Sequence, residues 1–238
     1  CSIEFWEDYI RKYLNWAEQN KKYIFAIANL DIENLVGDEV VRRWNEKFFI
    51  PFMQRTGIPV CFVWHEISFT DWKGYCKQYS YVGLSAVTTE GKNRELSEYL
   101  AKLNVAKRYG TLVHGFGMTQ IELLTKIPFL TVDSTTWLVG TKYGELNFWD
   151  GRTWKRLKKD QWKRQYKNKL IKLGANWELA EKENPYELIR INLLVFKKAE
   201  EDIRKHLRPK MYWLKQGVKE SMSLKKTNKK EEIKEEIS

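Results

Sequence analysis

Polar side chains that could do chemistry stand at the ends of apolar runs in the first 140 residues. Each run leads to a carboxylate, an imidazole or a hydroxyl, and these lie at Asp31, His65, Ser85, His114 and Asp133. Parallel strands bring their carboxyl ends to one edge of a sheet, where barrels and open α/β sheets both keep their sites. We therefore expect a functional site at that edge.

Asp133 is the leading candidate for a catalytic group. A carboxylate at the end of a strand can attack the anomeric carbon of a sugar and form a covalent glycosyl intermediate. The same side chain could instead cap a turn through its carboxylate. Asp31 has the same two interpretations, because it ends an apolar run and could cap the turn that follows.

A glycine-bearing turn, His114-Gly115-Phe116-Gly117-Met118-Thr119, leads into a predicted helix. Backbone N–H groups at such a helix start bind anions, and phosphate sites in barrels use the loops after the late strands. His65 and His114 are isolated in the sequence, and no cysteine-rich ligand set accompanies them. The sequence therefore predicts no metal site.

A strongly basic segment covers residues 152–176, with ten Lys or Arg residues against one acid, Asp160. Cations interleaved with flat aromatic rings suit a phosphate backbone and unstacked bases. The expected nucleic-acid contacts are Arg152, Lys155, Lys158, Lys159, Trp162, Lys163 and Arg164. The alternative is a solvated helix whose aromatic residues pack inward.

The charge distribution divides the chain. Residues 1–150 hold 17 Lys and Arg against 18 Asp and Glu, whereas the last 88 residues hold 25 against 13. We expect a catalytic domain over 1–150, a basic helical extension over 151–217 and a charged, disordered tail over 218–238. No apolar run is long enough for a membrane span, and three scattered cysteines favour a reducing, cytoplasmic location.

Apolar runs and helix-period segments alternate along the first domain. The runs are near-continuous, which is typical of strands in a parallel sheet. We predict strands at 23–32, 59–65, 79–86, 111–117 and 129–138, and helices at 3–20, 39–54, 70–78, 93–109 and 119–126. No dinucleotide or P-loop glycine motif occurs. The fold class is therefore α/β, with five βα units of a (β/α)₈ TIM-type barrel. About three strands would precede Cys1, or the open edges would associate in a homodimer.

Five segments occur in the order of a known family, at 28–31 (ANLD), 62–65 (FVWH), 81–86 (YVGLSA), 114–117 (HGFG) and 132–135 (VDST). Over about residues 3–140 the chain resembles the queuine-type tRNA-guanine transglycosylases and their phage and bacterial DNA-modifying relatives, which insert 7-deazaguanines. HGFGMT followed by VDSTTW is the most specific part of the resemblance.

The resemblance implies a role for each matched residue. Asp133 would be the nucleophile, and Asp31 would recognise the guanine edge. His65 stands where the family has a base-contacting glutamine. The remaining matches would line the base, ribose and phosphate, at Gly83, Leu84, His114, Gly115 and Gly117.

Two family features are absent from the sequence. The second catalytic aspartate of the family lies in a D-S-G-[GA]-F segment, which would fall before Cys1, so the chain as given could be inactive. The cysteine-rich zinc insertion of the tRNA enzymes is also absent, which favours the phage DNA-modifying branch.

These observations predict a nucleobase transglycosylase that exchanges guanine for a 7-deazaguanine in DNA or tRNA through a covalent aspartyl-glycosyl intermediate. Its partners would be a nucleic acid and a free 7-deazaguanine base, and it would need no cofactor. One alternative is a non-catalytic barrel that binds nucleic acid or a base. Another is a glycosidase or phosphosugar enzyme, which the basic segment disfavours.

Overall fold

The computed structural model describes residues 2–66, 68, 70–86, 91, 94–118, 120–133, 138 and 141–207. The described residues form two compact units. Unit 1 comprises residues 2–116 and 129–131, and unit 2 comprises residues 117–128 and 132–207. No helix among these residues is both long enough and apolar enough to cross a membrane.

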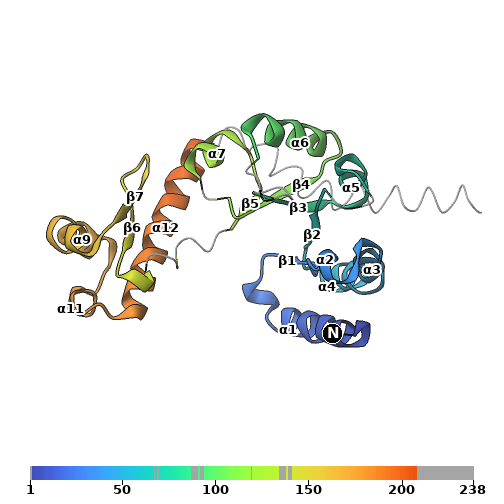
Figure 1. The fold of residues 1–238 in the computed structure, drawn as a ribbon, viewed down its shortest axis with the longest axis horizontal. Helices are drawn as coiled ribbons and strands as arrows, with labels where there is room; N and C mark the ends of the chain where they lie inside the picture. The colour runs from blue at the N-terminus through green and yellow to red at the C-terminus, as the bar shows by residue number, and fades with distance from the viewer. Residues whose placement is uncertain are drawn as a thin grey trace, which may run out of the picture. The chain divides into compact units, whose positions relative to one another are not determined.

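A five-stranded sheet in the order β1-β2-β3-β4-β5 forms the centre of the α/β fold. The strands are β1 (Ile27–Ala28), β2 (Val60–Trp64), β3 (Tyr81–Ser85), β4 (Leu112–Phe116) and β5 (Thr131–Val132). β1 to β4 pair in parallel, and the sheet curls like half of a barrel (Figure 1). The α/β prediction and the five strands are confirmed, since every predicted apolar run contains one of them.

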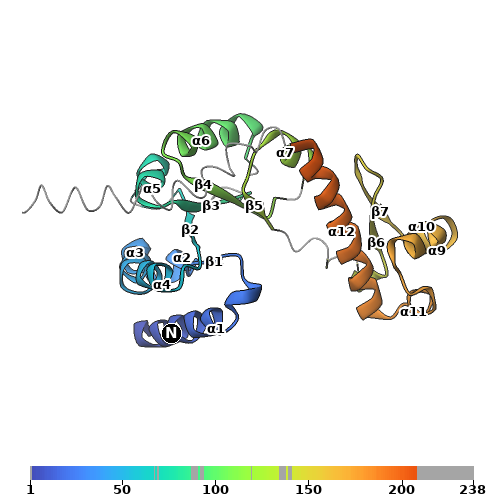
Figure 2. The ribbon, with the colours of Figure 1, turned by 180° about the vertical axis from the view of Figure 1, so that it is seen from behind.

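The helices of unit 1 precede the first strand or connect β1 to β4. They are α1 (Ile3–Gln19), η1 (Lys21–Tyr23), α2 (Glu33–Val36), α3 (Asp38–Trp44), the π-helical η2 (Asn45–Phe49), α4 (Ile50–Thr56), α5 (Trp72–Gln78) and α6 (Leu96–Arg108). α5 and α6 lie on one side of β3 and β4, as Figures 1 and 2 both show. All five residues of β2 are buried, whereas both residues of β5 are half-buried.

Three elements differ from the sequence-based expectation. Of the strand expected at 129–138, only Thr131–Val132 form a strand among the described residues. The first strand is two residues long, because residues 21–23 form a helical turn and Phe25 is 60% exposed. The helix expected at 39–54 is interrupted by the π-helical η2. Pro51 has no N–H to donate to Lys47 and its ring would clash with that carbonyl, so a regular α-helix cannot continue through this point.

Unit 2 contains a hairpin and helices. Its elements are α7 (Ile121–Lys126), η3 (Thr141–Tyr143), β6 (Leu146–Trp149), β7 (Trp154–Leu157), α9 (Lys159–Gln165), α10 (Lys167–Leu173), α11 (Trp177–Glu181) and α12 (Pro185–Leu207). α12 buries an apolar stripe with helical spacing, which includes Leu188, Ile191 and Val195. This stripe forms the core of the unit with side chains from the hairpin and from α9 to α11.

The hairpin corrects the expectation that residues 151–217 are a helical extension. Asp150 accepts hydrogen bonds from the N–H groups of Arg152 (3.0 Å) and Thr153 (2.8 Å), and Gly151 takes a positive φ of 96°. These contacts form the turn between β6 and β7, which pair antiparallel. The expected boundary at residue 150 falls inside this turn, so the described residues do not divide there. The expected tail at 218–238 lies outside the described residues.

Candidate functional site

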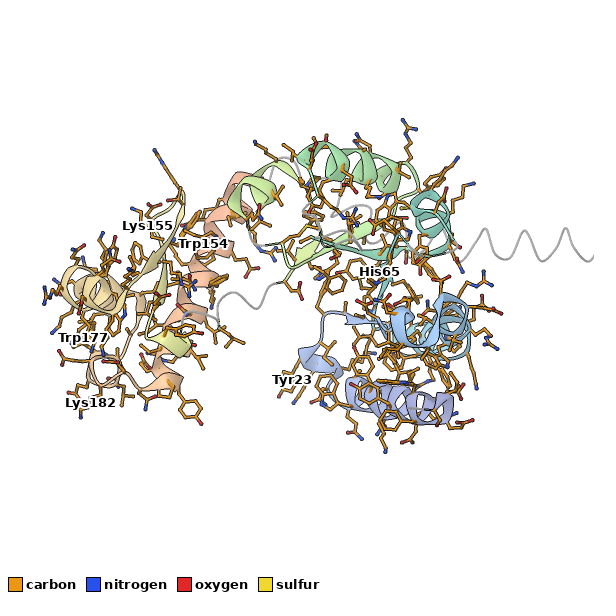
Figure 3. The ribbon with its side chains drawn as sticks, viewed as in Figure 1. Tyr23, His65, Trp154, Lys155, Trp177 and Lys182 are labelled. Carbon is orange, nitrogen blue, oxygen red and sulfur yellow. The ribbon has the colours of Figure 1, made fainter. Side chains whose placement is uncertain are left out.

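Two residues expected at the site, Asp31 and His65, meet at the carboxyl ends of β1 and β2. His65 Nε2 lies 2.7 Å from Asp31 Oδ1, within hydrogen-bonding distance. Glu33, the first residue of α2, places its Oε2 3.8 Å from the same nitrogen. Figure 3 shows His65 beyond the end of β2. The three side chains thus form one cluster within unit 1.

A buried asparagine holds the two strand ends in this register. The Asn29 N–H donates to the Cys61 carbonyl at 3.0 Å, and its side-chain oxygen accepts from the Val63 N–H at 2.9 Å. The Asn29 amide nitrogen donates to Asn45 Oδ1 at 3.0 Å. Because Asn29 bonds both β2 and η2, the segment that carries Asp31 is fixed against the end of β2.

The three ionisable side chains of the cluster have pKa values shifted in different directions. The hydrogen bond from His65 lowers the pKa of Asp31, and the same bond raises the pKa of His65. Burial raises the pKa of Glu33 to about 7, because removal from water disfavours a charged carboxylate. The Glu33 side chain is only 1% exposed, whereas that of Asp31 is 53% exposed. The cluster therefore opens to solvent on the Asp31 side and is closed behind Glu33.

Glu33 is the residue that the sequence analysis missed. It lies in a short segment, Asp31-Ile32-Glu33, whose acids look like ordinary surface or capping residues. The only signal in the sequence is its spacing of two residues from Asp31. That signal becomes informative only when the strand pairing brings His65 to the same place.

His114 is held by hydroxyl and aromatic neighbours within unit 1. Its Nδ1 lies 2.6 Å from Thr131 Oγ1, and the Tyr81 hydroxyl bonds the same threonine oxygen. The Phe116 ring packs edge-on against the imidazole with a centroid separation of 4.2 Å. His114 is therefore oriented from three sides by β3, β4 and β5.

The expected base-lining pair on β3 is packed against protein atoms. A Cβ at Gly83 would lie 2.3 Å from Cε2 of Phe116, so the missing side chain makes room for that ring. Leu84 is fully buried, and it pairs in register with Gly115 of β4, which is also buried. The side chain of Leu84 thus belongs to the core, and a ligand would meet backbone atoms here.

Asp133 and Gly117 meet in unit 2. The Gly117 N–H donates to Asp133 Oδ1 at 2.9 Å. Gly117 has a φ of 70°, a left-handed conformation that favours glycine. Asp133 directly follows β5, and its side chain is exposed. The glycine turn and the candidate nucleophile are therefore joined by one hydrogen bond, while Ser134 to Trp137 lie outside the described residues.

Trp162 corrects the expectation of a base-stacking ring. The side chain is fully buried in the core of unit 2, and its Nε1 donates to the Gly144 carbonyl at 2.8 Å. Trp154 stacks on Phe196 with a centroid separation of 4.4 Å, and Trp177 packs edge-on against Trp162; Figure 3 labels both Trp154 and Trp177. The aromatic residues of the basic segment pack inward because unit 2 needs their apolar area for its core.

The six cations among the expected nucleic-acid contacts fall into two groups. Lys155 pairs with Asp150 at 3.0 Å, and Lys159 and Lys163 both pair with Glu183, at 2.6 and 2.7 Å. The other three expected contacts are exposed and form no ion pair with any residue that the structure describes; they are Arg152, Lys158 and Arg164. Among the expected contacts, this second group offers charge that no carboxylate of the described residues already neutralises.

Comparison with known proteins adds no relative. No protein-family model matches the chain, and neither a curated protein nor a solved structure matches it. Its function must therefore be inferred from its own residues.

Proposed function

We propose that this chain is a nucleobase transglycosylase of the (β/α)₈ type that exchanges guanine for a 7-deazaguanine in DNA or tRNA. The observation that carries the proposal is the hydrogen bond from the Gly117 N–H to Asp133 Oδ1. It joins the two segments, HGFG and VDST, on which the resemblance to the transglycosylases is most specific. The half-barrel curl of the sheet supports the barrel fold.

Asp133 would perform the exchange in two displacements. A carboxylate oxygen attacks C1′ of the guanosine nucleotide, the C1′–N9 bond breaks, and guanine leaves with the bonding electron pair and takes up a proton. The incoming 7-deazaguanine then attacks C1′ through N9, loses its N9 proton and displaces the carboxylate, which gives net retention. The backbone N–H of Gly117 would hold the carboxylate in one orientation during both steps.

The target base must leave its stack before Asp133 can reach the sugar. Arg152, Lys158 and Arg164 are exposed and form no ion pair with a described residue, so they are suited to hold the phosphate backbone meanwhile. His114 and the backbone of Gly115 and Gly117 would lie beside the ribose and phosphate. By the resemblance, Asp31 and His65 would recognise the base edge.

Substitution of the nucleophile tests the proposal. The full chain is incubated with DNA or tRNA and labelled guanine, and incorporation is measured for the wild type, Asp133→Asn and Asp160→Asn. We expect Asp133→Asn to abolish incorporation with little change in nucleic-acid affinity, because the nucleophile acts in the chemical step. Asp160 is an exposed acid on α9 and serves as the matched control.

A covalent adduct on denaturing gels would identify the intermediate directly. It should form with the wild type and Asp160→Asn, and it should be absent with Asp133→Asn. Exchange by Asp133→Asn at the wild-type rate would refute the assignment. Nucleic-acid binding without exchange by any of the three proteins would favour the non-catalytic alternative.

A further inference from the structure

The Asp31–Glu33–His65 cluster has the arrangement of a cation site. One donor atom from each side chain can be chosen so that all three lie within 4.8 Å of one another. Two of the side chains come from the segment after β1 and the third from the end of β2. The Asn29 hydrogen bonds fix these two segments against each other. The backbone thus brings the donors together, and a bound ion would replace the hydrogen bond between His65 and Asp31.

Glu33 supplies the independent indication of a ligand. Its side chain is 1% exposed, and neither carboxylate oxygen has a hydrogen-bond partner within standard distances and angles among the residues that the structure describes. Buried polar atoms are nearly always satisfied, because an unsatisfied one costs the full free energy of its desolvation. The Oε2 atom lies 3.8 Å from His65 Nε2, which is too long for a hydrogen bond and is compatible with two ligands of one ion. A bound cation would satisfy this carboxylate.

We propose that Asp31, Glu33 and His65 bind a divalent first-row transition-metal ion of the zinc, manganese, iron or cobalt class. Two carboxylate oxygens and one imidazole nitrogen are suitable donors for these ions. Calcium and magnesium prefer oxygen donors alone, which the imidazole disfavours. The exposed side of Asp31 provides a path for the ion from solvent. Three protein ligands would leave at least one coordination position for water or another ligand.

The inference is separate from the proposed base exchange, which relies on Asp133. If a cation were bound to Asp31 and His65, the cation would contact the base edge, and these two side chains would not. The two hypotheses therefore predict different consequences for different substitutions. Loss of Asp133 should abolish exchange and leave metal binding unchanged, whereas loss of His65 should abolish metal binding.

Cobalt(II) provides a spectroscopic test that needs no activity. The full chain in metal-free buffer is titrated with cobalt chloride, and visible d–d absorption is recorded. We expect saturation at one equivalent and displacement by zinc. Asp31→Asn, Glu33→Gln and His65→Ala should each weaken binding by more than roughly 10-fold, since even loss of an outer-shell partner costs that much. Asp133→Asn should bind cobalt like the wild type.

Two matched variants control for general effects of the substitutions. Glu39→Gln removes an exposed acid from α3, and His114→Ala removes the other described histidine of unit 1. Both should retain cobalt affinity. Because Glu33 is buried, folding of each variant is checked by circular dichroism, and Asp31→Asn carries the test if Glu33→Gln fails to fold. Absence of saturable binding by the folded wild type, or wild-type affinity in folded His65→Ala, would overturn the proposal.

Discussion

Contacts with neighbouring side chains and backbone explain why Gly83 and Asn29 have their residue types. Gly83 lacks a side chain because the Phe116 ring of the neighbouring strand occupies the space where its Cβ would lie. The buried Asn29 amide accepts from the Val63 N–H of β2 and donates to the Asn45 side chain of η2. At both positions a packing role is established by contacts on the neighbouring strand. Such a role is compatible with a nearby ligand but does not require one.

Gly83→Ala should destabilise the fold by about 1–3 kcal/mol, the usual cost of overpacking a core. The new methyl group would lie 2.3 Å from Cε2 of Phe116, so the ring must shift. Urea denaturation of the wild type and the variant measures the free energy of unfolding. Phe116→Leu should recover part of the loss in the Gly83→Ala background. An additive double mutant would show that the two side chains do not compete for the same space.

At the junction of α11 and α12, one carboxylate links three helices. Glu187, in the first turn of α12, accepts from the Asn176 N–H at 2.7 Å and bonds the Arg190 guanidinium. Arg190 also donates to the Gly174 carbonyl at the end of α10. A single buried carboxylate thus connects the end of one helix with the starts of two others. Its hydrogen bond with Arg190, assisted by that from Asn176, lowers the pKa of Glu187.

Glu187→Gln should therefore lower the free energy of unfolding by about 1–3 kcal/mol at pH 7, the range for hydrogen bonds to charged groups. The pKa of Glu187 is lower in the folded than in the unfolded chain. Its stabilisation is thus complete above the ordinary glutamate pKa and is lost as the pH falls through the folded value. Urea titrations at pH 7 and pH 3 should show the difference between wild type and variant shrinking in acid.

Glu178→Gln removes an exposed acid from the neighbouring helix α11 and serves as the control. It should change stability little at either pH. An equal effect of the two substitutions at pH 7 would contradict the connecting role of Glu187.

At the scale of the whole molecule, the positive charge lies in the last 88 residues, of which residues 151–207 belong to unit 2. The last 88 residues hold 25 basic and 13 acidic residues, while residues 1–150 are nearly neutral. The structure pairs some of these cations with Asp150 and Glu183 and leaves others exposed. Nucleic-acid affinity, if the proposed function holds, should therefore depend on the unpaired group. Association of the open sheet edges in a homodimer stays a prediction.

The combined variant Arg152→Gln, Lys158→Gln and Arg164→Gln should weaken nucleic-acid binding of any sequence. Each lost phosphate contact should reduce the slope of log K against log salt by roughly 0.7–0.9. The matched variant Lys155→Gln, Lys159→Gln and Lys163→Gln also removes three charges, but these already face carboxylates, so its salt slope should change less. Fluorescence anisotropy over a salt series measures both quantities. Equal slopes for the two variants would contradict the division into two groups.

Local patterns in the sequence were sufficient to predict the order of the βα units. Near-continuous apolar runs at 59–65, 79–86 and 111–117 contain β2, β3 and β4, since burial on both faces leaves no polar alternation. The pair Asp150-Gly151 is also a local sequence signal for a hairpin turn, and it lies next to the basic segment. These features could be predicted because they depend on residues close in sequence.

The functional cluster and the role of Trp162 could not be predicted in this way. Asp31 and His65 lie 34 residues apart, and their contact depends on the register that pairs Ala28 with Cys61. The register between two strands is decided by hydrogen bonds between segments that are distant in sequence, and the residue pattern within either segment does not predict it. Trp162 has the same neighbours in sequence whether it faces solvent or the core, and only its packing beneath α12 and the hairpin buries it. Long-range pairing and burial were thus decided by the tertiary structure alone, because both require segments distant in the chain to meet.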